Sequence, residues 1–354
     1  MKSARWVGEY IFIVILMLSV IVIGVVYYDP FFHYHSPNDK FYYYLNNERS
    51  QNDGIIKHFD YDAIITGTSM AENFKVSETN KLFGVNAIKV CFAGGTYKEI
   101  NDNLEKAFKY NSKIRVVIRG LDSGYLLDDK NKVRNDLGEY PVYLYDDNIC
   151  NDVYYWFNRD IIFNWCLPAY RNCLAGDTGG ITDFDEYSNW MTDAEFGTDV
   201  VMKDYSFCAK SQTSKCLTKE EKEVIRENVN QNIVSLAQEH PQTTFYYFFT
   251  PYSVAWYVEL YQKGELEQQL EAEEYAISLI LSCDNIKLFS FNNERITANL
   301  NNYKDKTHYG EWINSYILEN IRADRGRLTK DNYMDYLKDE LKLYYEYSIL
   351  LTSE

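Results

Sequence analysis

The stretch that decides the fold is "DAIITGTSMAENF", residues 62–74. A short apolar run ends at Gly67, and Ser69 follows two residues later. An apolar run of this length bounded by glycine is typical of a buried β-strand. Ser69 is therefore either a nucleophile held at the end of a strand or an ordinary serine in a turn.

Working outward, the same pattern recurs along the chain. "FGVNAIKVCFAGG" is a second apolar run that stops at Gly94 and Gly95, "EINDNLEKAFKY" has the periodicity of an amphipathic helix, and "KIRVVIRGLD" is a third run. Strand, glycine-rich loop, helix and strand in this order predict an α/β fold with a doubly wound parallel sheet in three layers and right-handed crossovers.

The periodicity is lost over 123–216, which we interpret as an irregular, partly helical insertion. It returns at "LTKEEKEVIRENVNQNIVSLAQEH", where Thr218 and Glu221 form a capping-box pattern. The apolar runs "TTFYYFFTP" and "IKLFSF" predict two more strands, and the polar loop "YKDKTHYG" follows them. The predicted domain spans 61–322, and 323–354 is expected to be an amphipathic C-terminal helix.

The N-terminus has the features of a membrane anchor. Residues 10–28 are almost wholly apolar, and at about 1.5 Å per residue such a helix roughly spans a bilayer core. Basic residues in 1–9 predict a cytoplasmic N-terminus. No small-residue cleavage site follows, which favours an uncleaved anchor over a signal peptide. We therefore expect a single-pass protein with a juxtamembrane lead-in at 29–60 and its main domain outside the cytoplasm.

Composition excludes one class of partner. The formal net charge is −16, from 52 acidic and 36 basic side chains, and phosphate contacts need a basic face, so nucleic acid is not an expected ligand. The 33 tyrosines and 19 phenylalanines fit either a carbohydrate-stacking surface or, more simply, an aromatic core.

Seven cysteines would face an oxidising compartment. Cys166 with Cys173 and Cys208 with Cys216 could close small loops, although reduced buried thiols explain the sequence as well. Neither C-x-x-C nor H-x-x-x-H occurs, and "DDKNKVRND" lacks the glycine and glutamate of an EF-hand loop. We expect no metal and no cofactor.

The polar residues that carry chemistry follow the predicted strands. Parallel strands bring their carboxyl ends to one edge, so Ser69, Gly94, Asp122 and the loop 305–308 are expected to converge there. A serine needs a base to take its proton, and a histidine base needs a partner that fixes its tautomer. Of five histidines, His308 is the best candidate base, and Asp305 can orient it.

These motifs resemble the SGNH hydrolase superfamily, and within it the membrane-anchored group of alginate O-acetylation proteins and the teichoic-acid D-alanylation protein. "GTS" is similar to the block that carries the nucleophile, "FAGG" to the block that supplies an oxyanion N–H, and "DKTH" to the last block, D-x-x-H. "YYDPFFHYH" and "FFTPYSVAWY" extend the resemblance over about residues 1–322, without the insertion or the last thirty residues.

Carried over, the resemblance implies that Ser69 attacks an acyl group and that His308, oriented by Asp305, acts as general base and acid. Backbone N–H groups of Ser69 and of Gly94 or Gly95 would hold the oxyanion. One departure is that Asp122 follows the third strand where the family has an asparagine donor. Arg119 could contribute instead, and Asp122 could equally be a structural loop cap.

The resemblance implies an extracytoplasmic acyltransferase that acylates a cell-surface polysaccharide or teichoic acid beside an integral-membrane O-acyltransferase. Two alternatives stay open at this point. One is an esterase of the same fold that uses water as acceptor. The other is a non-catalytic interaction protein, for which the missing asparagine is the indication.

Overall fold

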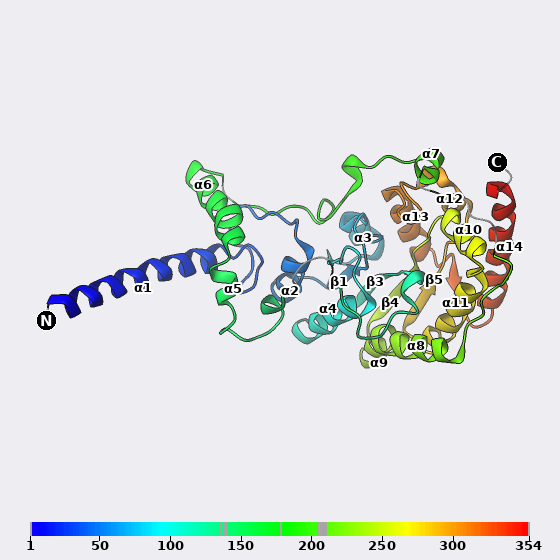
Figure 1. The fold of residues 1–354 in the computed structure, drawn as a ribbon, viewed down its shortest axis with the longest axis horizontal. Helices are drawn as coiled ribbons and strands as arrows, with labels where there is room; N and C mark the ends of the chain where they lie inside the picture. The colour runs from blue at the N-terminus through cyan, green and yellow to red at the C-terminus, as the bar shows by residue number, and fades with distance from the viewer. Residues whose placement is uncertain are drawn as a thin grey trace. The chain divides into compact units, whose positions relative to one another are not determined.

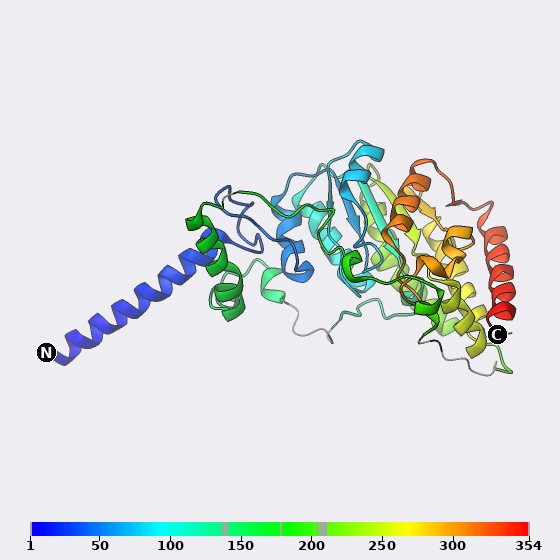
Figure 2. The same ribbon diagram turned by 90° about the horizontal axis from the view of Figure 1, so that it is seen from above.

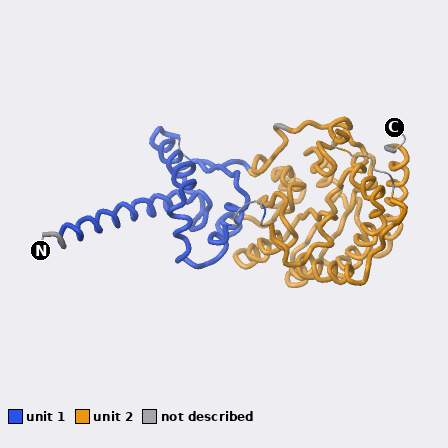
Figure 3. The backbone as a smooth tube through the Cα atoms, viewed as in Figure 1, with its two compact units in different colours: residues 1–59, 135–183 blue, residues 60–134, 184–354 orange. Residues whose placement is uncertain are grey.

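The computed structural model describes residues 2–134, 136, 141–177, 179–203, 205 and 211–352. The chain divides into two compact units, 1–59 with 135–183 and 60–134 with 184–354 (Figure 3). The first unit therefore combines the predicted anchor and lead-in with the middle of the expected insertion. The rest of that insertion belongs to the second unit.

The second unit is an α/β fold around a six-stranded mixed sheet with the order β2-β1-β3-β4-β5-β6. The five apolar runs of the sequence form parallel strands, namely β1 (Ala63–Thr66), β2 (Ala87–Lys89), β3 (Val116–Leu121), β4 (Thr244–Phe249) and β5 (Ile286–Phe289). The β1, β2 and β3 side chains are buried throughout, as expected for strands covered on both faces.

Helices cover both faces of this sheet (Figure 1). On one side lie α3 (Val76–Phe83) and α13 (Glu311–Arg322), which contact each other. On the other lie α4 (Tyr97–Tyr110), α8 (Lys219–Val229) and α9 (Ser235–Glu239). The predicted Thr218–Glu221 capping box is present and begins α8. This unit also contains α7 (Thr198–Met202), α10 (Val254–Lys263), α11 (Leu266–Ile280) and α12 (Arg295–Ala298).

The sheet is not purely parallel, and in this respect the sequence prediction was wrong. β6 (Arg327–Leu328) pairs antiparallel with β5 at the edge. Gly326 adopts φ +73°, and a Cβ there would lie 2.6 Å from the Phe291 ring, so only glycine allows this close turn. Segment 323–354 thus contains a strand before its predicted helix, α14 (Tyr333–Thr352), which packs on α10 and α11.

The first unit contains α1 (Lys2–Tyr28), α2 (Glu48–His58), α5 (Val153–Trp156) and α6 (Leu167–Ala175), with a π-helical turn at Ile161–Cys166 (Figure 2). Its centre is the buried Asp29 carboxylate, which accepts hydrogen bonds from the Tyr155 hydroxyl at 2.7 Å and the Tyr34 amide at 2.7 Å. Part of α1, Arg5–Tyr28, is long and apolar enough to cross a membrane, a property that a signal sequence shares.

Cys166 and Cys173 are free thiols, so their possible pairing is not present. Cys216 is also free and exposed. Its possible partner, Cys208, lies outside the described residues.

Candidate active site

Three loops meet at the carboxyl edge of the sheet in the second unit. Ser69 follows β1, and Gly94 follows β2. The loop 304–310 leads directly into α13. This is the edge at which open α/β sheets hold their reactive groups. The convergence arises because β1, β2 and β3 run parallel and end together.

Ser69, His308 and Asp305 form a continuous hydrogen-bonded chain. The distance from Ser69 Oγ to His308 Nε2 is 2.8 Å, and the distance from His308 Nδ1 to Asp305 Oδ2 is also 2.8 Å. With Nδ1 protonated toward the carboxylate, Nε2 is free to accept the serine proton. The arrangement supplies a nucleophile, a base and an orienting carboxylate in the order that acyl transfer requires.

The Asp305 carboxylate is itself held by its own loop. Its Oδ1 accepts the backbone N–H groups of Thr307 and His308, each at 2.8 Å. Partial burial alone would raise the pKa of Asp305, but the hydrogen bonds and charge of His308, with the two backbone N–H groups, hold that pKa well below its usual range. Asp305 is therefore ionised at neutral pH and can stabilise a cationic His308.

The turn that carries Ser69 is fixed from several sides. Gly67 has φ +153°, and a Cβ there would lie 2.8 Å from the Ala71 Cβ, so the tight exit from β1 requires glycine. The Met70 carbonyl accepts hydrogen bonds from the Tyr309 hydroxyl at 3.0 Å and the Asn314 amide at 3.1 Å. The loop and helix that bring His308 into place thus also hold the serine turn.

The backbone N–H groups expected to hold an oxyanion differ in whether they already donate a hydrogen bond. Among the described residues, the N–H groups of Ser69 and Gly94 have no hydrogen-bond acceptor. Gly95 does not fill this role, because its N–H donates to the Phe92 carbonyl at 2.7 Å in the turn before α4. Arg134 holds the same loop by donating from Nη1 to the Gly94 carbonyl at 2.7 Å.

Asp122 occupies the position of the expected donor but acts only as an acceptor. Its buried carboxylate accepts the Thr68 hydroxyl at 2.8 Å, the Tyr252 hydroxyl at 2.8 Å and the Thr250 hydroxyl at 3.0 Å. Burial raises the pKa of Asp122, and these three hydroxyls oppose the rise. Asp122 is therefore attached to the residue before the nucleophile rather than placed to bind an oxyanion.

Arg119 does not lie with these groups. It is fully buried in β3, where its guanidinium donates to the Asn232 carbonyl at 2.7 Å and the Tyr97 carbonyl at 3.3 Å. Burial lowers its pKa. A β-strand alternates its side chains between two faces, and Arg119 points to the face covered by α4 rather than to the edge.

Trp190 is a residue of this site that the sequence did not reveal. Its indole N–H donates to the Ser69 carbonyl at 3.1 Å, and its ring meets the His308 imidazole edge-on at 5.6 Å. The Lys304 ammonium lies over the indole, 4.0 Å from the ring centroid. Trp190 comes from the irregular stretch 184–203, where no periodicity or spacing marks it as close to Ser69.

No cluster of three or more His, Cys, Asp or Glu side chains suited to a metal ion occurs in the described part of the chain. The expectation that the protein uses no metal and no cofactor stays a prediction. The chemistry available at the site is that of its own serine, histidine and carboxylate.

Comparison with family models finds no match, and comparison with curated proteins finds none. Among solved structures, the chain is similar to "a putative platelet activating factor from Streptococcus pneumonia", with 11% identity and a TM-score of 0.35 over 82% of this chain and 90% of that one. A likeness this distant carries no argument about fold or function.

Proposed function

We propose that the protein is an SGNH-type serine acyl-transfer enzyme, anchored in the membrane, whose main domain acts outside the cytoplasm. The observation that carries the proposal is the chain Ser69–His308–Asp305, with both hydrogen bonds at 2.8 Å. A hydrogen bond between the nucleophile and its base, with that base oriented by a carboxylate, is the arrangement by which a serine becomes acylated.

In the proposed reaction, Ser69 Oγ attacks the carbonyl carbon of an acyl donor while His308 Nε2 takes its proton. The N–H groups of Ser69 and Gly94 stabilise the oxyanion of the tetrahedral intermediate. His308 then returns the proton to the leaving group, which departs and leaves an ester on Ser69. An acceptor hydroxyl gives its proton to His308 Nε2 and attacks this ester. The bond between the acyl carbon and Ser69 Oγ then breaks, and His308 returns the proton to Oγ, which regenerates Ser69.

The proposed acceptor is a hydroxyl of a cell-surface polysaccharide or teichoic acid, and the proposed partner is an integral-membrane O-acyltransferase. These two assignments rest on the motif resemblance and on the apolar α1. A specific observation favours water as an alternative acceptor: the side chains of His308 and Asp305 are 27% and 45% exposed, so solvent reaches the base. Esterase activity of the same site is therefore the second candidate.

The first test is labelling of the full chain with an active-serine phosphonate. The second test offers the protein a chromogenic acetyl ester and an oligosaccharide, and it measures acetyl transfer to the oligosaccharide. Wild type should be labelled, and S69A and H308A should not. S77A is the matched control, because Ser77 also bonds a carboxylate, Asp185, but has no histidine partner. Labelling that persists in S69A would refute the proposal. Release of the chromophore with acetate but no acetylated oligosaccharide would favour the esterase.

A further inference from the structure

The first unit has a helical segment packed beside the end of α1. It comprises α5, the π-helical turn and α6, and it lies next to the carboxyl end of α1 in Figure 1 and Figure 2. The Tyr170 hydroxyl donates to the Gly24 carbonyl at 2.8 Å, and the Trp165 and Phe31 rings meet edge-on at 5.0 Å. The segment is thus attached to α1 at a defined level.

This segment has an inner and an outer apolar face. The inner face packs within the unit through Tyr155, Ile161 and Cys166, which are all buried. The outer face leaves large apolar side chains exposed: Tyr154, Phe163, Leu167 and Leu174, the last of which is 88% exposed. Phe163, Leu167 and Leu174 recur at helical spacing and form one stripe. Several large apolar groups gathered on one short segment indicate a contact surface.

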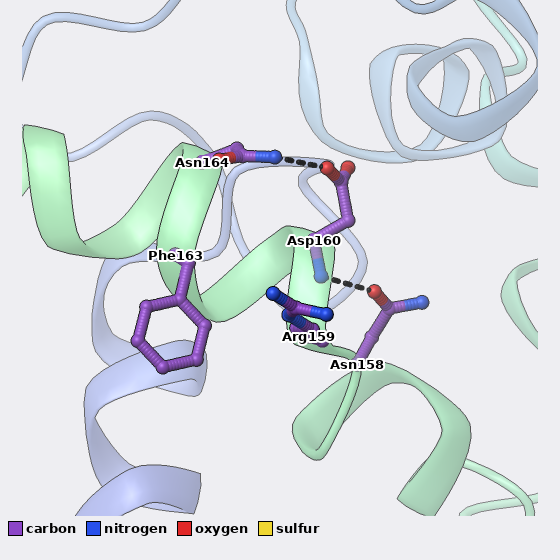
Figure 4. Close-up of a pocket in the computed structure, with 5 residues that line it drawn as sticks. All are labelled: Asn158, Arg159, Asp160, Phe163 and Asn164. Carbon is purple, nitrogen blue, oxygen red and sulfur yellow. Dashed lines mark hydrogen bonds between the residues drawn. The ribbon is translucent and has the colours of Figure 1, made fainter.

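A shallow hollow adjoins this stripe (Figure 4). It is lined by Asn158, Arg159, Asp160, Phe163 and Asn164. The Asn164 side-chain amide donates to the Asp160 carboxylate, and the Asp160 backbone N–H donates to the Asn158 side-chain oxygen at 2.8 Å. These three residues are thus hydrogen-bonded in a chain. Arg159 makes no hydrogen bond or ion pair with any described residue. The hollow therefore presents a guanidinium beside an exposed aromatic ring.

The attachment to α1 sets the depth of the segment. Gly24 lies four residues before Tyr28, which places the Tyr170 contact about 6 Å from the end of α1 along its axis. The exposed apolar surface of α1 includes Ile23, just before this level, and Tyr27, just beyond it. A bilayer that covers Ile23 therefore reaches the level of α6 as well. The Tyr170 contact, about 6 Å from the end of α1, falls within the 5–10 Å depth at which interfacial helices lie.

We infer that α5, the π-helical turn and α6 lie in the outer interface of the bilayer that α1 crosses. Phe163, Leu167 and Leu174 enter the acyl-chain boundary, and Arg159 binds a phospholipid phosphate. Guanidinium groups pair well with phosphate oxygens, and exposed aromatic rings are favoured at the interface. The inference rests on the proposal that α1 spans the membrane, and it is independent of the chemistry at Ser69.

The test uses the full chain in phosphatidylcholine–phosphatidylglycerol vesicles that contain a phospholipid with a diazirine near the top of its acyl chain. After photolysis, tryptic peptides are examined for lipid adducts. We expect adducts on the α1 peptide, 6–40, and on 160–171. Peptide 307–322, which carries the exposed Trp312, is the control and should stay unlabelled.

Each outcome decides the inference. Labelling of 6–40 without 160–171 overturns it while leaving the anchor intact, and equal labelling of 307–322 shows unselective capture and also overturns it. Labelling of 160–171 that falls as the protein density in the vesicles rises would show that a second copy covers this surface, and it would overturn the inference. If neither peptide is labelled, α1 is not inserted and the inference fails with its premise, whereas phosphonate labelling of Ser69 reports the proposed function separately.

A paired variant adds a second measurement. F163E/L167E changes only exposed side chains of the stripe, so the fold should be kept and the adducts on 160–171 should fall to the level of the control peptide. Y110E, an equivalent change at an exposed tyrosine of α4, should leave that labelling unchanged. Undiminished labelling in F163E/L167E would contradict the inferred orientation.

Discussion

At the scale of single residues, Asp305 has the clearest testable role. D305N keeps the size of the side chain but removes the charge that fixes the His308 tautomer and stabilises its cation. We expect kcat for ester cleavage to fall by about 10⁴-fold, the loss that this substitution causes in a comparable triad. D60N, which removes an exposed carboxylate paired with Lys113, is the control and should retain full activity.

The pH dependence of Asp305 follows from the sign of its shift. Its pKa is depressed in the folded protein, so its stabilising contribution is fully present above the ordinary aspartate pKa of about 3.9 and is lost as the pH falls through the lower folded pKa. Between pH 5 and pH 9 Asp305 should not titrate. The wild-type pH–rate profile should therefore show no transition in that range that belongs to Asp305.

Thr68 joins the buried Asp122 carboxylate to the turn that carries Ser69. T68V removes the hydroxyl that donates to Asp122 and leaves a buried carboxylate short of one donor, at a cost of about 1–3 kcal/mol in the free energy of unfolding. Because Ser69 is the next residue, we expect phosphonate labelling to slow by about 10- to 100-fold.

The conservative change T68S should restore both stability and labelling, because serine supplies the same donor. Combining T68V with D122N should cost less than the sum of the two single changes, since both remove one interaction. Labelling of T68V at the wild-type rate, measured on folded protein, would show that this contact does not position Ser69.

At the scale of elements, the start of α4 links helix capping to the loop that contains Gly94. Thr96 and Glu99 form a complete capping box directly after Gly94 and Gly95. T96A should lower the free energy of unfolding by about 1 kcal/mol. It should also slow phosphonate labelling, because the loop that presents the Gly94 N–H loses its anchor.

The chain offers a matched control for this prediction. Thr218 forms the same capping box at α8, and its partners there do not include any residue of the site. T218A should cost a similar amount of stability without changing the labelling rate. Equal labelling rates in T96A and T218A would separate the cap of α4 from the site and contradict the prediction.

The packing of α14 introduces a second pH dependence. Glu273 on α11 and Glu340 on α14 are both almost fully buried, and this burial raises the pKa of both carboxyl groups. Above the ordinary glutamate pKa of about 4.3, the unfolded chain ionises while the folded chain keeps its protons, so the free energy of unfolding falls as the pH rises. The loss ends only when the folded carboxyl groups ionise as well.

E273Q removes one of these titrating groups while keeping its shape. Its melting temperature should fall less than that of wild type between pH 5 and pH 8, as measured by thermal unfolding. E271Q on the same helix is the control, because its carboxylate is not buried in this way, and its melting curve should follow wild type. A wild-type melting temperature that rises over this pH range would contradict the assigned direction.

At the scale of the whole molecule, the sequence predicts what depends on local pattern. Short apolar runs predict β1 to β5, and their parallel order predicts that Ser69 and His308 converge. Contacts between distant segments leave no such pattern. Trp190 reaches Ser69 from an aperiodic stretch. Arg119 lies inside β3, on the face covered by α4, whereas Asp122 lies just past the end of that strand. Neither placement could be predicted before the strands were paired.

The association of 135–183 with the N-terminal segment is also a contact between distant parts of the chain, and no local sequence pattern predicts it. It depends on the Asp29 carboxylate accepting the Tyr155 hydroxyl, a contact between residues 126 positions apart. The antiparallel β6 depends on a left-handed turn at Gly326, which a lone glycine in the sequence does not specify. The sequence-based prediction of an uncleaved anchor also concerns the whole molecule, and it can be tested through two native thiols.

Cys150 in the first unit and Cys216 in the second are both exposed and free. If α1 is an uncleaved anchor with its N-terminus in the cytoplasm, a membrane-impermeant maleimide should label both thiols in intact cells. C150S and C216S assign each adduct, and a cysteine introduced by S3C should react only after the membrane is permeabilised. Labelling of the S3C thiol in intact cells, with Cys150 and Cys216 protected, would reverse the topology and place Ser69 out of reach of any cell-surface polymer.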